Sequence, residues 1–194
     1  GKGIIPVDLE EAQSHEYYAN DRVFVNLKLA GDSTNDKTIE MLKKSAQPVI
    51  EIVWNDIYDL SKEYFRWEFA TAISGWYLNI QPFDQPNVEE AKIVARKVMK
   101  EFQEKGRLPE LKPALVTDNI KVYGDVTGVE IKDVLKSFLS SVEAGKNYVS
   151  IQAYLTPGEK VTSAIQKLRT KIHKKYKIAT TAGYGPRFLH STGQ

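Results

Sequence analysis

The sequence predicts an α/β fold with a mostly parallel five-stranded sheet and helices on both faces. Five short apolar runs alternate with longer amphipathic stretches, and this alternation is typical of parallel strands joined by crossover helices. The composition agrees, because 42% hydrophobic and 27% charged residues are close to ordinary globular usage. A length of 194 residues is enough for one such domain.

The expected strands are short runs rich in β-branched and aromatic residues, and the third of them is split and has the weakest pattern. They are residues 22–29, 48–54, 114–116 with 120–123, 148–155 and 177–181.

The expected helices have apolar residues at helical spacing, and Gly106 is a plausible stop for the third of them. They are residues 36–46, 56–78, 86–105, 129–142 and 159–175. Around them we expect an N-terminal arm over residues 1–20, one α/β domain over 21–182 and a C-terminal tail over 183–194.

Composition excludes several classes of protein. The chain has no cysteine, which excludes disulfides and thiolate metal sites and fits a reducing cytosol, so we expect a cytoplasmic protein. No apolar run approaches the length of a membrane span, and the first residues match no signal or transit peptide. A formal charge of +2 gives no support for nucleic-acid binding, and we expect the basic stretch 167–177, with His173 in it, to be a solvated helix face.

The most informative segment is Pro82–Lys92, which we call the helix-start segment. Pro86 suits the first turn of a helix, and Asp84 or Gln85 is placed to cap it. Gln85 and Lys92 are seven residues apart, about two helical turns, so they project from roughly the same face. Such a helix start, with free N–H groups, an amide and an ammonium, suits sugar hydroxyls and a phosphate. The local alternative is an ordinary capped surface helix with a solvated lysine.

The pattern Pro-Phe-Asp-Gln-Pro-x-Val-Glu-x-x-Lys in Pro82–Lys92 resembles the second signature of the glucose-6-phosphate isomerases. Residues 66–78 are similar to the family's preceding helix, and residues 1–7 to the segment after its catalytic glutamate. The ending, residues 183–194, is similar to the tail of fused transaldolase/glucose-6-phosphate isomerase proteins. One departure is Asn87, where the family usually has glycine.

The resemblance implies a second sugar-isomerase (SIS) domain, which acts with an N-terminal isomerase domain of the same protein in a homodimer. It implies interconversion of glucose 6-phosphate and fructose 6-phosphate through a cis-enediol, with no metal and no cofactor. Lys92 would assist ring opening, while Gln85 and Asp84 would line the pocket for the hexose phosphate. The family's base glutamate, phosphate-binding loop and arginine all match positions outside residues 1–194, so this segment alone is expected to be inactive.

The resemblance also implies that a histidine, lent by the neighbouring subunit, helps to open the ring. His15 and His190 are the two candidates, with a surface histidine and a packing tail as their respective alternatives. Glu68 lies among the aromatic residues of 56–78, where we expect core or interface packing, and a buried carboxyl there is a minor catalytic candidate.

Two other functions stay open at this stage. A sensor of the same domain type would bind a phosphosugar without converting it, and an interaction domain would use the aromatic helix 56–78 as a dimer interface. A base glutamate upstream of the segment favours the enzyme over the sensor, and dimerisation without a response to fructose 6-phosphate favours the interaction domain.

Overall fold

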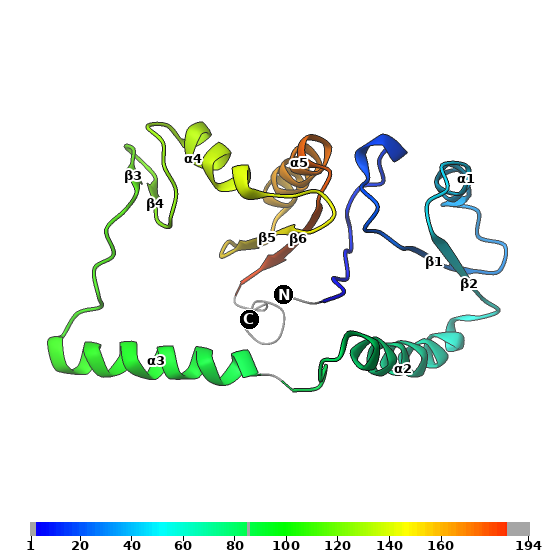
Figure 1. Cartoon of the computed structure of the whole chain (residues 1–194), viewed down its shortest axis with the longest axis horizontal. Helices are drawn as coiled ribbons and strands as arrows, with labels where there is room; N and C mark the ends of the chain where they lie inside the picture. Colours follow the sequence, from blue (N-terminus) through cyan, green and yellow to red (C-terminus); the bar gives the residue numbers. More distant parts are fainter. Residues whose placement is uncertain (1–2, 85, 186–194) are drawn as a thin grey trace. The chain divides into compact units, whose positions relative to one another are not determined.

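The computed structural model of the chain describes residues 3–84 and 86–185 (Figure 1). The elements, in chain order, are η1 (His15–Tyr17), β1 (Phe24–Leu29), α1 (Asp36–Lys44), β2 (Val49–Trp54), η2 (Ile57–Asp59), α2 (Leu60–Leu78), α3 (Pro86–Lys105), β3 (Leu115–Val116), β4 (Lys121–Val122), α4 (Ile131–Phe138), η3 (Leu139–Ser141), β5 (Tyr148–Ala153), α5 (Glu159–Tyr176) and β6 (Ala179–Tyr184).

The α/β class is confirmed, but the single five-stranded sheet is wrong. The strands of the described residues form three separate two-stranded sheets: β1 with β2, β3 with β4, and β5 with β6. The first and last pairs are parallel, each joined by the crossover helix that a parallel pair requires. The third predicted strand region instead folds back on itself as an antiparallel pair of two-residue strands, too short to extend either parallel pair.

The described chain divides into two compact units, one of residues 3–84 with 144–185 and the other of residues 86–143. This division differs in kind from the predicted arm, domain and tail, whose boundaries at residues 20 and 182 stay predictions.

In the first unit, α1 covers one face of the β1–β2 pair. Its buried Ile39 and Leu42 pack with Tyr18 in a small apolar cluster, because helical spacing turns these residues toward the sheet. The opposite face of the pair carries Val25 and Leu27, which are exposed among the described residues. The β1–α1–β2 segment therefore has one covered and one open face.

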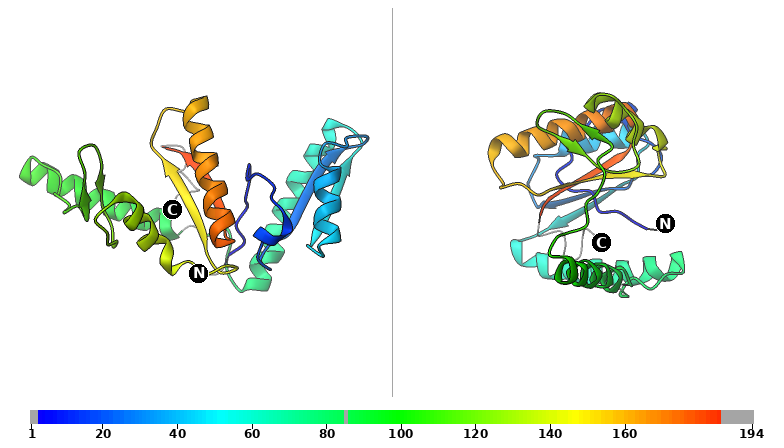
Figure 2. Two further views of the ribbon diagram at one scale, coloured as in Figure 1. Left: turned by 90° about the horizontal axis from the view of Figure 1, so that it is seen from above. Right: turned by 90° about the vertical axis from the view of Figure 1, so that its left-hand side faces the viewer.

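The second crossover of this unit is β5–α5–β6, drawn from yellow to red in Figures 1 and 2. Ile172 of α5, Ile178 just before β6, and Ala179 and Thr180 at the start of β6 are all buried, so the helix and the strand share a packed boundary. Lys177, between them, adopts a left-handed backbone with φ 55°, which closes α5 and lets the chain reverse.

Helix α2 ends in a Schellman motif that leads into the helix-start segment. Asn79 is left-handed at φ 53°, its N–H donates to the carbonyl of Trp76, and the N–H of Ile80 donates to the carbonyl of Gly75. After this turn, the ring of Pro82 packs against Gly75. A Cβ added to Gly75 would lie 2.5 Å from Cδ of Pro82. Only glycine fits this approach, so Gly75 fixes where the segment leaves α2.

The aromatic side chains of η2 and α2 are not core in the described part of the chain. Tyr58, Phe65, Trp76 and Tyr77 are all exposed, so the core alternative is wrong and the interface alternative stays a prediction. Glu68 is exposed as well. The buried carboxylate of α2 is Glu63, which pairs with Arg66 at 2.5 Å.

The second unit contains α3, the β3–β4 hairpin and α4. Helix α3 begins at Pro86 and ends at Lys105. Gly106, with φ 68°, donates its N–H to the carbonyl of Phe102, so the predicted end of the helix at Gly106 is confirmed. Val134 of α4 and Leu139 of η3 are its buried apolar residues among those described.

We expect Gly75→Ala to destabilise the chain by about 1–3 kcal/mol, because the new methyl group overlaps the ring of Pro82. Helix propensity alone predicts the opposite, a gain of about 1 kcal/mol. Urea unfolding followed by circular dichroism measures the difference. Ser74→Ala is the matched control and should change stability by less than about 0.5 kcal/mol. A Gly75→Ala protein as stable as the wild type would contradict the Pro82 contact.

Candidate functional site

Two sets of residues are candidates for function: the helix-start segment predicted from sequence and a buried polar cluster that was not predicted. In the first set, Asp84 is exposed in the turn that follows Pro82. Gln85 lies outside the described residues. Because Asp84 is exposed, its carboxylate is accessible to a polar ligand.

Lys92 is exposed on the second turn of α3, as predicted for a residue that faces solvent or a ligand. It makes no ion pair or hydrogen bond with the described residues. Its neighbour Glu89 instead pairs with Arg96 at 2.5 Å. The hydrogen bond and charge of Arg96, with a smaller contribution from Lys92, lower the pKa of Glu89. The ammonium of Lys92 is thus available to a partner from outside the helix.

The three histidines are placed very differently. His15 is exposed in η1, and His190 lies outside the described residues. His173, which we expected on a solvated helix face, is completely buried (0% exposed), so that prediction is wrong. Lys171 and Lys174 are exposed, whereas His173 and Ile172 between them are buried.

His173 belongs to a polar cluster around the carboxylate of Glu10. Glu10 lies in residues 3–14, a stretch without a helix or strand that we call the arm from here on. Oε1 of Glu10 accepts from the N–H of Thr180 at 2.9 Å and from its hydroxyl at 2.7 Å. Oε2 accepts from Nη1 of Arg22 at 2.5 Å and lies 3.1 Å from Nδ1 of His173. Side chains from the residues before β1, from α5 and from β6 thus converge on one carboxylate.

Arg169, 2% exposed, holds the arm at a second place in the same cluster. Its guanidinium donates to the carbonyls of Asp8 and Leu9 at 2.8 and 3.2 Å, and to the hydroxyl and carbonyl of Thr180 at 3.2 and 2.7 Å. It also donates to Oε1 of Gln166 at 3.3 Å. Burial lowers the pKa of Arg169, and the negative charge of Glu10 opposes that shift.

Two aromatic contacts close the cluster. The ring of Tyr18 lies edge-on to the His173 ring, with centroids 5.0 Å apart, and under the guanidinium of Arg22 at 5.2 Å. The backbone N–H of Gln13 donates to the Tyr18 hydroxyl at 2.8 Å, and burial raises the pKa of that hydroxyl. Nε2 of His173 lies 3.0 Å from the carbonyl oxygen of Tyr17, so both ring nitrogens face oxygen acceptors.

Glu10 is the most strongly perturbed acid among the described residues. Burial by itself raises its pKa, but the contact with His173, the hydrogen bonds from Thr180 and the charge of Arg22 outweigh burial. The result is a pKa lowered from an ordinary 4.5 to about 2. The carboxylate is therefore ionised throughout the physiological pH range, and the folded state contains it as an anion.

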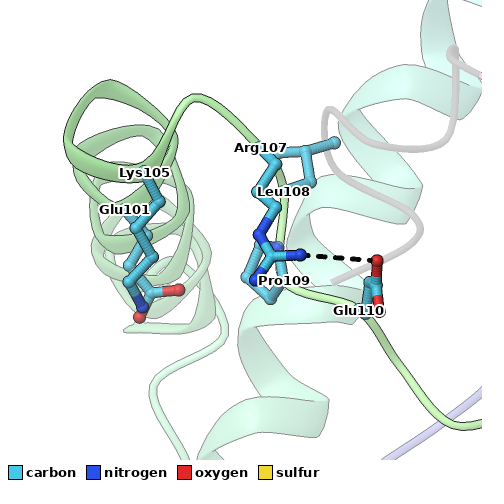
Figure 3. Close-up of a pocket in the computed structure, with 6 residues that line it drawn as sticks. All are labelled: Glu101, Lys105, Arg107, Leu108, Pro109 and Glu110. Atoms are coloured by element: carbon cyan, nitrogen blue, oxygen red, sulfur yellow. Dashed lines mark ion pairs between the residues drawn. The ribbon is translucent and has the colours of Figure 1, made fainter.

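The surface hollows of the described residues are shallow and of lesser interest. One of about 190 Å³, between the end of α3 and the following loop, is lined by charged side chains such as Arg107 and Glu110, which lie 3.8 Å apart (Figure 3). Another, of about 380 Å³, lies at the carboxyl ends of β5 and β6 beside Tyr154 and Gly185. The second has the location expected for ligands of parallel sheets, but none of the residues that line it is charged.

The comparisons with known proteins add no identity. No family model, curated protein or solved structure matches this chain. Among the described residues there is no cluster of three metal-binding side chains. None of the described helices is both long and apolar enough to cross a membrane. The cytoplasmic location stays a prediction.

Glu10→Gln should remove stability at neutral pH and have much less effect in acid. A carboxylate whose pKa falls on folding stabilises the folded state above its unfolded pKa of about 4.5, and that stabilisation is lost as pH falls toward 2. The wild type and the variant should therefore differ fully above pH 5 and converge toward pH 2, as measured by urea unfolding at each pH. Glu11→Gln, at the exposed neighbour, should show no such convergence, and a pH-independent loss in Glu10→Gln would contradict the charge-based account.

Proposed function

We propose that this chain is the C-terminal part of an aldose–ketose isomerase that interconverts glucose 6-phosphate and fructose 6-phosphate. The observation that supports this proposal most is Lys92, an exposed ammonium without a partner among the described residues. It lies on the second turn of a helix that begins at Pro86, within the segment that resembles the isomerase signature. The proposal rests on that resemblance together with the accessibility of Lys92.

Each residue has a proposed role. Lys92 stands near the ring oxygen of the hexose phosphate, where a cation stabilises the oxyanion that develops as the ring opens. Gln85 and Asp84 contact sugar hydroxyls. His15 or His190, from the neighbouring subunit of a homodimer, moves the proton of the ring-opening step.

The proton transfer between carbons 2 and 1 needs a carboxylate base within hydrogen-bond reach of the substrate. In this proposal that base is supplied by an N-terminal isomerase domain of the same protein, to which a transaldolase domain is fused in the proteins with a similar tail. Residues 1–194 provide binding and ring opening in this proposal. The partners are thus a hexose phosphate, the N-terminal domain and a second subunit, without nucleic acid or membrane.

Lys92→Ala in the protein that includes the N-terminal domain should lower kcat for fructose 6-phosphate formation by about 100-fold, the usual loss when one stabilising group of an oxyanion is removed. A coupled dehydrogenase assay measures this rate. Lys97→Ala is the matched control, because Lys97 is also an exposed lysine of α3 but projects from another face. Equal turnover in the wild type and Lys92→Ala would remove Lys92 from the mechanism.

Residues 1–194 alone should show no measurable isomerisation but should still bind fructose 6-phosphate weakly, because the base is absent and Lys92 is present. Isothermal titration calorimetry and the same coupled assay separate these outcomes. If residues 1–194 turned over at the rate of the longer protein, the catalytic base would lie within residues 1–194, which contradicts this proposal. Binding by the longer protein without any turnover would favour the alternative, a non-catalytic sugar-phosphate-binding regulatory module.

A further inference from the structure

The carboxylate of Glu10 is bound as a ligand is bound. Its two oxygens accept three hydrogen bonds, from the N–H and hydroxyl of Thr180 and from Nη1 of Arg22, at 2.5–2.9 Å. Nδ1 of His173 lies 3.1 Å from Oε2 but is not aligned for a hydrogen bond. Thr180 and His173 are each 0% exposed. Backbone and side-chain donors that converge on one pair of oxygens are the usual construction of an oxyanion site.

The residues that surround the carboxylate lie on or next to regular elements, whereas Glu10 itself does not. Thr180 lies on β6, His173 on α5, and Arg22 two residues before β1. Glu10 lies in residues 3–14, a stretch without a helix or strand. The pocket is therefore built on the regular elements of the unit, whereas its occupant is on a segment that side-chain contacts hold in place.

The pocket offers more donors and more positive charge than one carboxylate uses. Nε and Nη2 of Arg22 are buried and have no hydrogen-bond partner among the described residues, and Nε lies 4.0 Å from Oδ1 of Asp21. Arg169, in the same cluster, donates to neutral oxygens of Thr180 and of the arm. A group with three or four oxygens and a charge near −2 matches this environment better than a carboxylate does.

We propose that this pocket is an oxyanion-binding site of the phosphate class, that Glu10 occupies it as an internal ligand, and that a phosphate group displaces Glu10 and releases the N-terminal arm. The site is separate from the helix-start segment and does not depend on the isomerase proposal. Because Glu10 is tethered, it competes at an effective concentration in the millimolar range. Phosphate therefore binds the wild type weakly and a variant without the carboxylate more tightly.

The test is chemical rescue of Glu10→Ala by inorganic phosphate, with the melting temperature as readout and chloride added to keep ionic strength constant. Glu10→Ala should melt below the wild type in chloride. It should gain about 3–5 °C once phosphate exceeds its dissociation constant about tenfold. The matched control is Glu11→Ala, which removes an adjacent but exposed carboxylate and keeps Glu10 in the pocket. This variant and the wild type should gain clearly less.

Two further arms make the result decisive. If Glu10→Ala does not fold, Glu10→Gln keeps the side-chain shape and is titrated in the same way. Hydrogen exchange of residues 3–14 in the wild type should rise with phosphate, as the arm leaves. Equal phosphate stabilisation of the Glu10 variant and Glu11→Ala, or an arm whose exchange phosphate leaves unchanged, would overturn the proposal.

The source of the phosphate group is identified by comparing inorganic phosphate with glycerol 3-phosphate. Rescue by both shows that the pocket opens outward once the arm leaves and accepts phosphate monoesters. Rescue by inorganic phosphate alone shows an enclosed site for the free ion. Both outcomes support the oxyanion site, and rescue by neither overturns it.

Discussion

The ionised carboxylate of Glu10 holds together parts of the first unit that are far apart in the sequence. The buried apolar residues of this unit are few among those described, and the largest fully buried side chains include Arg169, His173 and Thr180. Burying charges costs free energy unless each is paired and hydrogen-bonded. Glu10 pairs with Arg22, contacts His173 and accepts from Thr180, so one group holds together the arm, the residues before β1, α5 and β6. Its loss would leave buried cations without a counter-charge.

The individual helices and strands could be predicted because each depends mainly on the pattern of residues within its own segment. Helix α3 runs from Pro86 to Lys105 as the sequence indicates, since a proline suits a first turn and Gly106 supplies the left-handed residue after the last one. The sheet could not be predicted in the same way. Strand pairing is a long-range property, and the third strand region contains only two paired residues on each side of its turn.

The candidate residues show the same limit. Lys92 was predicted to project from a helix face that a ligand can reach because it lies seven residues, about two turns, after Gln85, and Lys92 is exposed on α3. The Glu10 cluster was missed because Glu10 lies in a segment without periodicity and contacts Thr180 across 170 residues of sequence. One signal was present: His173 and Arg169 are four apart on α5, so they share a face, and Ile172 adjoins that face. The many lysines of the same helix made this buried face hard to recognise in the sequence.

The most direct measurement of the central claim is a double-mutant cycle between Glu10 and Arg22, with Glu10→Gln, Arg22→Gln and the double variant unfolded in urea at neutral pH. A bond between buried charges predicts a coupling free energy of about 1–3 kcal/mol, so that the double variant loses less stability than the two single variants together. Additive losses, with a coupling free energy near zero, would contradict the claim that the Glu10 carboxylate and Arg22 hold the arm in place.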